Sequence, residues 1–206
     1  TDEDQSRADE EKLASWTYTQ KAGFYWAGAY ACDQFILVGT DDGEDGYDKG
    51  HSNVLSLDPK TGRVIDQVQL KEVGDLRSTI TREEGTNNYY FTTKGGYFYR
   101  LQVNKDGTMV QNSLTALLLD NGSGSSRTPA MSTSTPTIYN GRAYIGVSGV
   151  SQFGAYSGHN ITVIDLDDFS IAYKVITQGY PQTSGVLTTA YEEKEGKAYI
   201  YFFDNY

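Results

Sequence analysis

The sequence predicts an all-β protein, namely a β-propeller of four-stranded antiparallel blades, either a whole ring or a large piece of one. The first observation is composition, because 17 of the 206 residues are Tyr and 22 are Gly. Aromatic residues suit strands and Gly suits turns, and no long stretch has helical periodicity. The second observation is that one pair of hairpins recurs in tandem. Such repetition is typical of propeller blades and not of sandwiches.

The second hairpin of each repeat is recognised by its turn. A strand at 53–57 runs into Asp58-Pro59-Lys60-Thr61-Gly62, and another strand follows. Proline fixes φ in this turn and glycine is free to take a positive φ. The same unit recurs around Asn104–Gly107 and again around Asp165–Asp168, and the first two turn glycines, Gly62 and Gly107, are 45 residues apart.

The first hairpin of each repeat precedes that unit. The clearest example has the dipeptide Asn140-Gly141 between its strands, a strong signal for a two-residue hairpin turn. A fourth copy consists of this first hairpin alone. The expected strand pairs are 26–31 with 34–39, 78–81 with 89–93, 135–139 with 142–147, and 184–191 with 197–202.

These repeats divide the chain into blades. Three complete blades and a half-blade do not close a ring, so either the N-terminal strand partly completes the last blade or the chain is part of a longer propeller. We expect the second arrangement, with further blades supplied by a longer chain. The predicted segments are a disordered acidic leader at 1–12, an outer strand of a preceding or closing blade at 13–21, blade one at 22–72, blade two at 73–118, a Ser/Gly-rich connection at 119–134, blade three at 135–177, and the first half of blade four at 178–206.

The turn Leu57-Asp58-Pro59-Lys60-Thr61-Gly62, with strands on both sides, resembles the blade repeat of quinoprotein-like (PQQ-repeat) propellers, which typically reads lyALDaxTGxxxW. The stretch Trp16-Thr17-Tyr18 is similar to the Trp-bearing outer strand of such a blade. Ile65 stands where the Trp that follows the first turn would be. The resemblance implies a propeller fold and, for non-catalytic relatives, a role as a scaffold for protein assembly.

Composition and motifs exclude several functions. A net charge of −10 makes nucleic acid a poor partner, and no apolar run is long enough to span a membrane. Cys32 is the only cysteine, so the adjacent cysteine pair expected over the cofactor of a quinoprotein dehydrogenase is impossible, and PQQ binding is not expected. The chain contains no nucleophile elbow and no phosphate-binding loop.

An acidic, glycine-rich loop is the candidate for a metal site. Its carboxylates could supply oxygen ligands to Ca²⁺, although Gly43 interrupts the pattern of an EF-type loop and no late Glu follows. The alternative is a solvated acidic turn. The candidate ligands are Asp41, Asp42, Asp45 and Asp48.

Two long loops, 41–52 and 148–159, are expected on one face of the propeller, the face on which such folds usually bind ligands. Each loop ends with one of the two histidines of the chain, which could form a small polar site with Asp45 or Asp48, or could be structural. Aromatic residues could form a stacking platform, or could be cross-strand pairs. The predicted ligand-binding residues are Tyr47, His51, Phe153, Tyr156 and His159.

These features predict a non-enzymatic binding or scaffold module that recognises a glycan or a protein through this face. The acidic surface, the single cysteine and the richness in Tyr, Thr and Gly suit a secreted or cell-surface bacterial protein whose signal peptide is outside this sequence. The alternative function is part of a propeller enzyme, quinone-dependent or polysaccharide-active, with its catalytic residues outside this chain.

Overall fold

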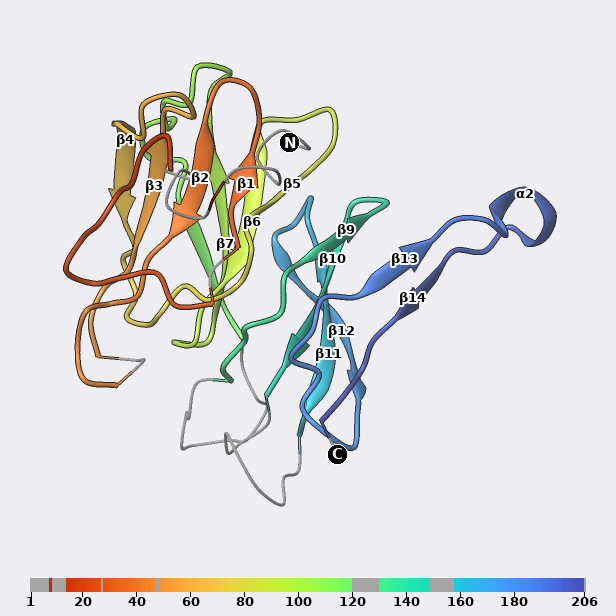
Figure 1. Ribbon diagram of the computed structural model, residues 1–206. Helices are drawn as coiled ribbons and strands as arrows, with labels where there is room; N and C mark the ends of the chain where they lie inside the picture. The colour runs from red at the N-terminus through yellow and green to blue at the C-terminus, as the bar shows by residue number, and fades with distance from the viewer. Residues whose placement is uncertain are drawn as a thin grey trace.

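The computed structural model describes residues 8, 14–26, 28–46, 49–119, 130–148 and 158–205. They form three four-stranded antiparallel sheets and a two-stranded hairpin, which succeed one another along the chain (Figure 1). In each complete sheet the strands lie side by side in sequence order. The predicted fold class is therefore confirmed, since these sheets are the blades of a partial propeller.

The strand boundaries follow the predicted hairpins. The first sheet contains β1 (Tyr30–Ala31), β2 (Ile36–Gly39), β3 (Asn53–Leu57) and β4 (Val64–Gln69). The second sheet contains β5 (Thr81–Arg82), β6 (Asn88–Thr92), β7 (Tyr97–Gln102) and β8 (Thr115–Leu118). The third sheet contains β9 (Thr137–Tyr139), β10 (Arg142–Val147), β11 (Asn160–Asp165) and β12 (Ser170–Ile176). The last hairpin pairs β13 (Val186–Thr188) with β14 (Tyr199–Tyr201), and α2 (Glu192–Glu195) lies between them.

Two buried clusters join the three sheets. Because successive side chains of a strand point to opposite faces, β6 sends Tyr89 and Phe91 toward the first sheet and Tyr90 toward the third. The first cluster contains Phe35 and Leu37 of the first sheet, and the second contains Ile145 of the third. The aromatic strands β6 and β7 of the second sheet therefore supply apolar surface to both neighbours.

The turn between the third and fourth strands is built in the same way in the first and third sheets. The Asp58 carboxylate accepts hydrogen bonds from the N–H groups of Lys60 and Thr61, and Asp165 accepts them from the two residues at the same spacing. Gly62 has φ +69°, whereas the fifth residue of the later turn is Phe169, at φ +50°. The aspartate thus fixes both turns, and Phe169 adopts a conformation that ordinarily favours glycine.

The turn glycines are contact points between repeats. Trp16 Nε1 donates a 2.9 Å hydrogen bond to the Pro59 carbonyl, and a methyl group on Gly62 would lie only 2.4 Å from the Trp16 ring. In the second sheet, a methyl group on Gly107 would lie 3.1 Å from Ile65 Cδ1. Ile65 therefore packs on the Gly107 turn much as Trp16 packs on the Gly62 turn, consistent with the predicted equivalence of Ile65 and a docking tryptophan.

The N-terminal segment and the first strands of the sheets differ from the regular pattern of the repeats. Residues 14–21 join no sheet in the described part of the chain, so the outer strand expected at 13–21 stays a prediction, and Trp16 packs on the Gly62 turn. The innermost strands are also shorter than predicted: β1 and β5 have two residues each. Side chains replace strand pairing there, since the Ser78 hydroxyl donates to the Thr92 carbonyl and accepts from the Thr92 N–H. Most of the leader 1–12 and of the connection 119–134 lies outside the described residues.

One backbone hydrogen bond recurs in all four repeats, and we call it the closing bond. A residue one to four positions after the second strand donates its N–H to a carbonyl six or seven positions before the first strand. The bonds measure 2.9–3.2 Å and join Asp41 to Gly23, Lys94 to Asp75, Ser148 to Met131, and Asn205 to Tyr180. The β13–β14 hairpin therefore begins a fourth repeat in the same way as the three complete sheets.

A second backbone bond, the junction bond, connects neighbouring repeats. Leu76 N–H donates to the Thr40 carbonyl, and Ser132 N–H donates to the Thr93 carbonyl, both at 3.2 Å. Each donor directly follows the acceptor residue of a closing bond. The corresponding residue after Tyr180 is Pro181, which has no N–H. The junction between the third sheet and the last hairpin therefore lacks this bond.

Candidate functional site

Arg77 organises a charged cluster between the first two sheets. Its guanidinium contacts both carboxylate oxygens of Asp41 at 3.3 Å and also forms an ion pair with Asp75. The side chains of Asp41 and Arg77 are about 15% exposed, and that of Asp75 is 1% exposed. Because the second oxygen of Asp75 accepts the Asp42 N–H at 2.9 Å, the cluster also anchors the start of the acidic loop.

Burial raises the pKa of both carboxyls. Removal from water raises the pKa of Asp75, against the opposing effect of the hydrogen bond from Asp42 N–H. Burial also raises the pKa of Asp41, against the opposing charge of Arg77. Arg77 thus forms ion pairs with both Asp41 and Asp75, and these two contacts fix the position of its guanidinium.

Two exposed aromatic rings lie on this guanidinium. The rings of Tyr25 and Trp26 stack with centroids 5.0 Å apart and an interplanar angle of 28°. The Arg77 Cζ is 4.7 Å from the Tyr25 centroid and 5.5 Å from that of Trp26. Tyr25 is 52% exposed and Trp26 is 71% exposed. We call these two rings the aromatic platform. Neither ring was predicted to belong to the site.

The backbone at the platform is strained. Trp26 has φ +61°, a left-handed conformation that costs a residue with a side chain about 1–2 kcal/mol. Exposure of most of an indole ring adds no burial to offset that strain. Backbone strain held at an exposed position supports a hypothesis of function.

Of the predicted calcium ligands, Asp41 and Asp42 are engaged by the protein itself, and Asp45 is an exposed residue of the same loop. The Asp42 carboxylate accepts hydrogen bonds from the N–H groups of Glu44, Lys49 and Gly50, at 2.9–3.2 Å. Asp41 is paired with Arg77, and Asp48 lies outside the described residues. Within the described ranges, no three His, Cys, Asp or Glu side chains are grouped to hold a metal. The calcium site therefore stays a prediction.

The two histidines occupy different surroundings. The exposed His51 ring has Nδ1 3.1 Å from the Leu70 carbonyl of its own sheet. His159 is 3% exposed and stacks on Tyr180 with centroids 5.9 Å apart. Burial lowers the pKa of His159, and the charge of Asp204 opposes this effect. Each ring is thus held within its own part of the fold. The other predicted ligand-binding residues, Tyr47, Phe153 and Tyr156, lie outside the described residues.

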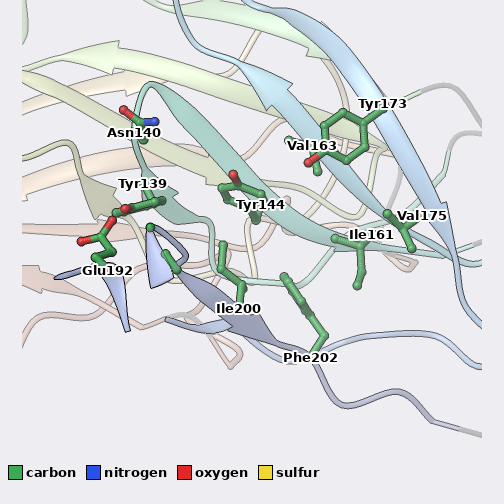
Figure 2. Close-up of a pocket in the computed structure, with 12 residues that line it drawn as sticks. Tyr139, Asn140, Tyr144, Ile161, Val163, Tyr173, Val175, Glu192, Ile200 and Phe202 are labelled. Carbon is green, nitrogen blue, oxygen red and sulfur yellow. The ribbon is translucent and has the colours of Figure 1, made fainter. Parts of the chain in front are cut away.

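Away from this cluster, a cavity of about 590 Å³ lies between the third sheet and the last hairpin. Figure 2 shows Tyr144, Tyr173 and Val175 on one side of it, and Ile200 and Phe202 on the other. We call this cavity the open groove.

The described part of the chain contains no helix long and apolar enough to cross a membrane.

Comparisons with known proteins agree with the fold. The chain superposes on a quinohemoprotein alcohol dehydrogenase from Pseudomonas putida HK5 with TM-score 0.56 and 14% identity, over 84% of this chain and 28% of that one. It also superposes on a europium-containing methanol dehydrogenase with TM-score 0.55 and 14% identity, over 80% of this chain and 27% of that one. No protein-family model matches the chain, and no curated protein matches it in sequence.

These matches define a class of fold. The chain is a partial β-propeller of the type found in the quinoprotein dehydrogenases, as the turn Asp58–Gly62 predicted. It spans about a quarter of the length of the two matched dehydrogenases. At 14% identity the likeness concerns the fold alone.

Proposed function

We propose that this chain is a non-enzymatic binding module that recognises a glycan through the aromatic platform. The supporting observation is the exposed, stacked pair Tyr25–Trp26, whose position is fixed from beneath by Arg77 and its two carboxylates. A flat aromatic surface that is already ordered loses little entropy when a ligand packs on it. Sugar rings present such a ligand surface through their C–H bonds.

The platform adjoins the loop that the sequence singled out. The Asp41 N–H donates to the Gly23 carbonyl, and a methyl group on Gly43 would lie 3.3 Å from Ala22 Cβ. The acidic loop therefore begins beside the segment that leads into the platform, and we expect its polar groups to hydrogen-bond the hydroxyls of a sugar that stacks on Trp26. This combination of an apolar face and flanking polar groups suits a carbohydrate more than a purely apolar ligand. We also propose that the protein acts at the cell surface or outside the cell, where glycans are found.

The test is binding of cellohexaose, chitohexaose and laminarihexaose by calorimetry. We expect at least one of them to bind, and Trp26→Ala to weaken that binding at least tenfold by removing the stacking surface. Tyr25→Ala should have a smaller effect in the same direction. Phe203→Ala is the matched control, because this ring is 68% exposed but belongs to the last hairpin.

Two results would overturn the proposal. One is the failure of all three sugars to bind while a protein partner is captured through the same platform, which would make the module a protein scaffold. The other is sugar binding that Trp26→Ala leaves unchanged. In that case a triple substitution of Tyr47, Phe153 and Tyr156 by Ala tests whether the predicted loop aromatics form the site instead.

A further inference from the structure

We propose that a cavity between the first two sheets binds a small acidic sugar, a uronic acid, whose carboxylate pairs with Arg82 and Lys105. The cavity has a volume of about 660 Å³ and is lined by hairpin turns of both sheets. We call it the cationic cavity. Its volume lies within the range of cavities that hold small ligands. The proposal does not rest on the aromatic platform, because neither ring of the platform lines this cavity.

Three hairpin turns form the walls of the cationic cavity. Cys32 and Gln34 flank the turn between β1 and β2, Gly85–Asn87 belong to the turn between β5 and β6, and Asn104 and Lys105 follow β7. The two turns of the second sheet are joined by a backbone bond, 3.0 Å long, from the residue after β7 to the residue before β6. The two sheets meet behind the turns, where an edge-to-face aromatic pair has its ring centroids 5.0 Å apart. The cavity therefore has walls that the fold holds in place.

The lining of this cavity is positively charged, although the whole chain has a net charge of −10. Arg82 and Lys105 line it, and none of the described lining residues is Asp or Glu. Two acids of the same turns bond elsewhere. The Asp106 carboxylate accepts the N–H and the hydroxyl of Thr108, and the Glu83 carboxylate accepts the Tyr90 hydroxyl. The cavity therefore favours an anion.

The guanidinium of Arg82 is already oriented. Its Nε and Nη2 donate to the Thr86 carbonyl at 2.9 and 2.7 Å. Hydrogen bonding with the Tyr30 hydroxyl raises the pKa of Arg82, which therefore stays charged. A guanidinium has five N–H donors, so it can bind a carboxylate while it keeps these contacts. An anion that binds here pays little to order this side chain.

The third sheet shows that the fold does not require this charge. Val103 and Leu166 are equivalent, because each follows the third strand of its sheet and donates its N–H to the carbonyl just before the second strand, at 3.0 and 2.9 Å. Asn104-Lys105 follows in the second sheet, whereas Asp167-Asp168 follows in the third. The same turn thus carries opposite charges in neighbouring sheets.

The neighbouring cavity differs in the same direction. A cavity of about 400 Å³ lies between the second and third sheets, and Glu83 and Glu84 line it together with Arg82. Its carboxylates oppose the binding of an anion. The positive lining is therefore specific to the junction between the first two sheets.

The other lining groups indicate that the anion also carries hydroxyls. The carboxamides of Gln34, Asn87 and Asn104 line the cavity, and a carboxamide can both donate to and accept from a hydroxyl. The half-buried Tyr30 adds an aromatic surface on which the C–H groups of a sugar can pack. A carboxylate, several hydroxyls and an apolar ring face are combined in a uronic acid.

The test is calorimetry with digalacturonate, its neutral methyl ester and inorganic phosphate. We expect digalacturonate to bind, and the ester to bind at least tenfold more weakly because it has no charge for Arg82 and Lys105. An increase in salt from about 50 to about 500 mM should weaken the binding of digalacturonate, since salt screens these contacts. No binding of digalacturonate at concentrations up to about 10 mM would overturn the proposal. Equal affinity for phosphate would also overturn it, because the hydroxyl partners would then contribute nothing.

Matched charge removals locate the site. Lys105→Gln should weaken digalacturonate binding at least fivefold, and Arg82→Gln at least tenfold. Lys60→Gln is the control, because it removes the same charge from the corresponding turn of the first sheet, outside the cationic cavity. Lys105 is an exposed turn residue, so its substitution leaves the fold intact. Equal effects of Lys105→Gln and Lys60→Gln would show that only the overall charge matters and would reject the site.

The chain also contains a reporter at this site. Cys32 is its only cysteine and lines the cavity, with its thiol 3.4 Å from the Phe35 carbonyl that it donates to. Bound digalacturonate should slow alkylation of Cys32 by iodoacetamide at least fivefold, with half of the effect at the Kd found by calorimetry. Unchanged alkylation at saturating sugar would place the binding elsewhere and overturn the proposal. The neutral sugars used for the aromatic platform carry no carboxylate, so their failure to bind would leave this result unaffected.

Discussion

Two junctions follow hairpins of the same kind but are filled differently. One lies between the second and third sheets, and the other lies between the third sheet and the last hairpin. The first has a backbone junction bond from Ser132 to Thr93 and a cluster of buried side chains. The second has Pro181 in the donor position and a cavity of about 590 Å³. Side-chain contacts remain there, such as the 2.8 Å bond from Ser134 Oγ to the Thr183 carbonyl. The hairpins on both sides are alike, so the two junctions differ in their apolar filling and in the junction bond.

The largest difference is expected from truncation of large side chains. Phe98→Ala should destabilise the protein by about 3–5 kcal/mol, because it opens a cavity in the closed junction. Tyr173→Ala, at the open groove, should cost about 1 kcal/mol, since that ring is already 45% exposed. Urea unfolding of both variants measures this. Equal losses would show that the open groove is as tightly packed as the closed junction.

Glycine substitutions should separate local from global effects. A methyl group on Gly146 would lie 1.6 Å from the Pro181 carbonyl oxygen, so Gly146→Ala must push the lead into the hairpin away from the third sheet. At the matched position of the first sheet, a methyl group on Gly39 would lie 2.4 Å from the Leu76 side chain. Gly39→Ala should therefore overpack a closed junction, at about 1–3 kcal/mol.

Amide exchange distinguishes the two outcomes. With Gly146→Ala, exchange should accelerate in β13 and β14 and stay unchanged in β7. With Gly39→Ala, it should accelerate in β7 as well, because the whole cluster loses stability. The same exchange pattern in both variants would contradict the expectation that the last hairpin separates from the third sheet without loss of stability in the first two sheets.

Acid should weaken the junction between the third sheet and the last hairpin more than the junction between the first two sheets. This effect should be smaller than those of the truncations and the glycine substitutions. Burial lowers the pKa of His159, so the unfolded chain takes up a proton more readily than the folded one. Stability is then full above the ordinary histidine pKa and falls as pH drops from about 6.5 toward the lowered value. The raised pKa values of Asp41 and Asp75 act in the opposite sense, because the folded state binds their protons more tightly.

We therefore expect acidification from pH 7 to pH 5.5 to speed proteolysis within 177–205 while the first two sheets stay intact. His159→Phe keeps a ring against Tyr180 and removes the titration, so it should flatten this pH dependence. If the pH dependence in His159→Phe equals that of the unsubstituted protein, another group is responsible.

Much of the fold was predictable because its signals are local. The Asp58–Gly62 turn contains its own aspartate acceptor and a glycine at positive φ, and Asn140-Gly141 adopts φ +49° and +70°. Strands β9 and β10 lie within the hairpin predicted around this dipeptide. The helix α2 was not predicted, although Glu192–Glu195 followed by Gly196 at φ +63° is a local signal that could have indicated it.

The candidate site was less predictable because its contacts are distant in sequence. Asp41 and Arg77 are 36 residues apart, and no motif marks their pairing. Tyr25 and Trp26 lie against Arg77, which follows them by about 50 residues in the sequence. The loop 41–52 was predicted from its acidic composition, but the sequence does not indicate that Asp41 pairs with Arg77 or that Asp42 accepts backbone hydrogen bonds within the loop. Sequence patterns identify turns more readily than they identify which repeat supplies a partner.

The recurring closing bond has a consequence for engineering. Its donors and acceptors occupy equivalent points of successive repeats, so they serve as natural splice sites for recombination. Joining the chain after Asp75 to the residues that follow Met131, for example, would excise one repeat and keep the local backbone geometry at the seam. A gene encoding this protein could gain or lose whole units at such seams, and a library of chimaeras cut there would retain intact modules.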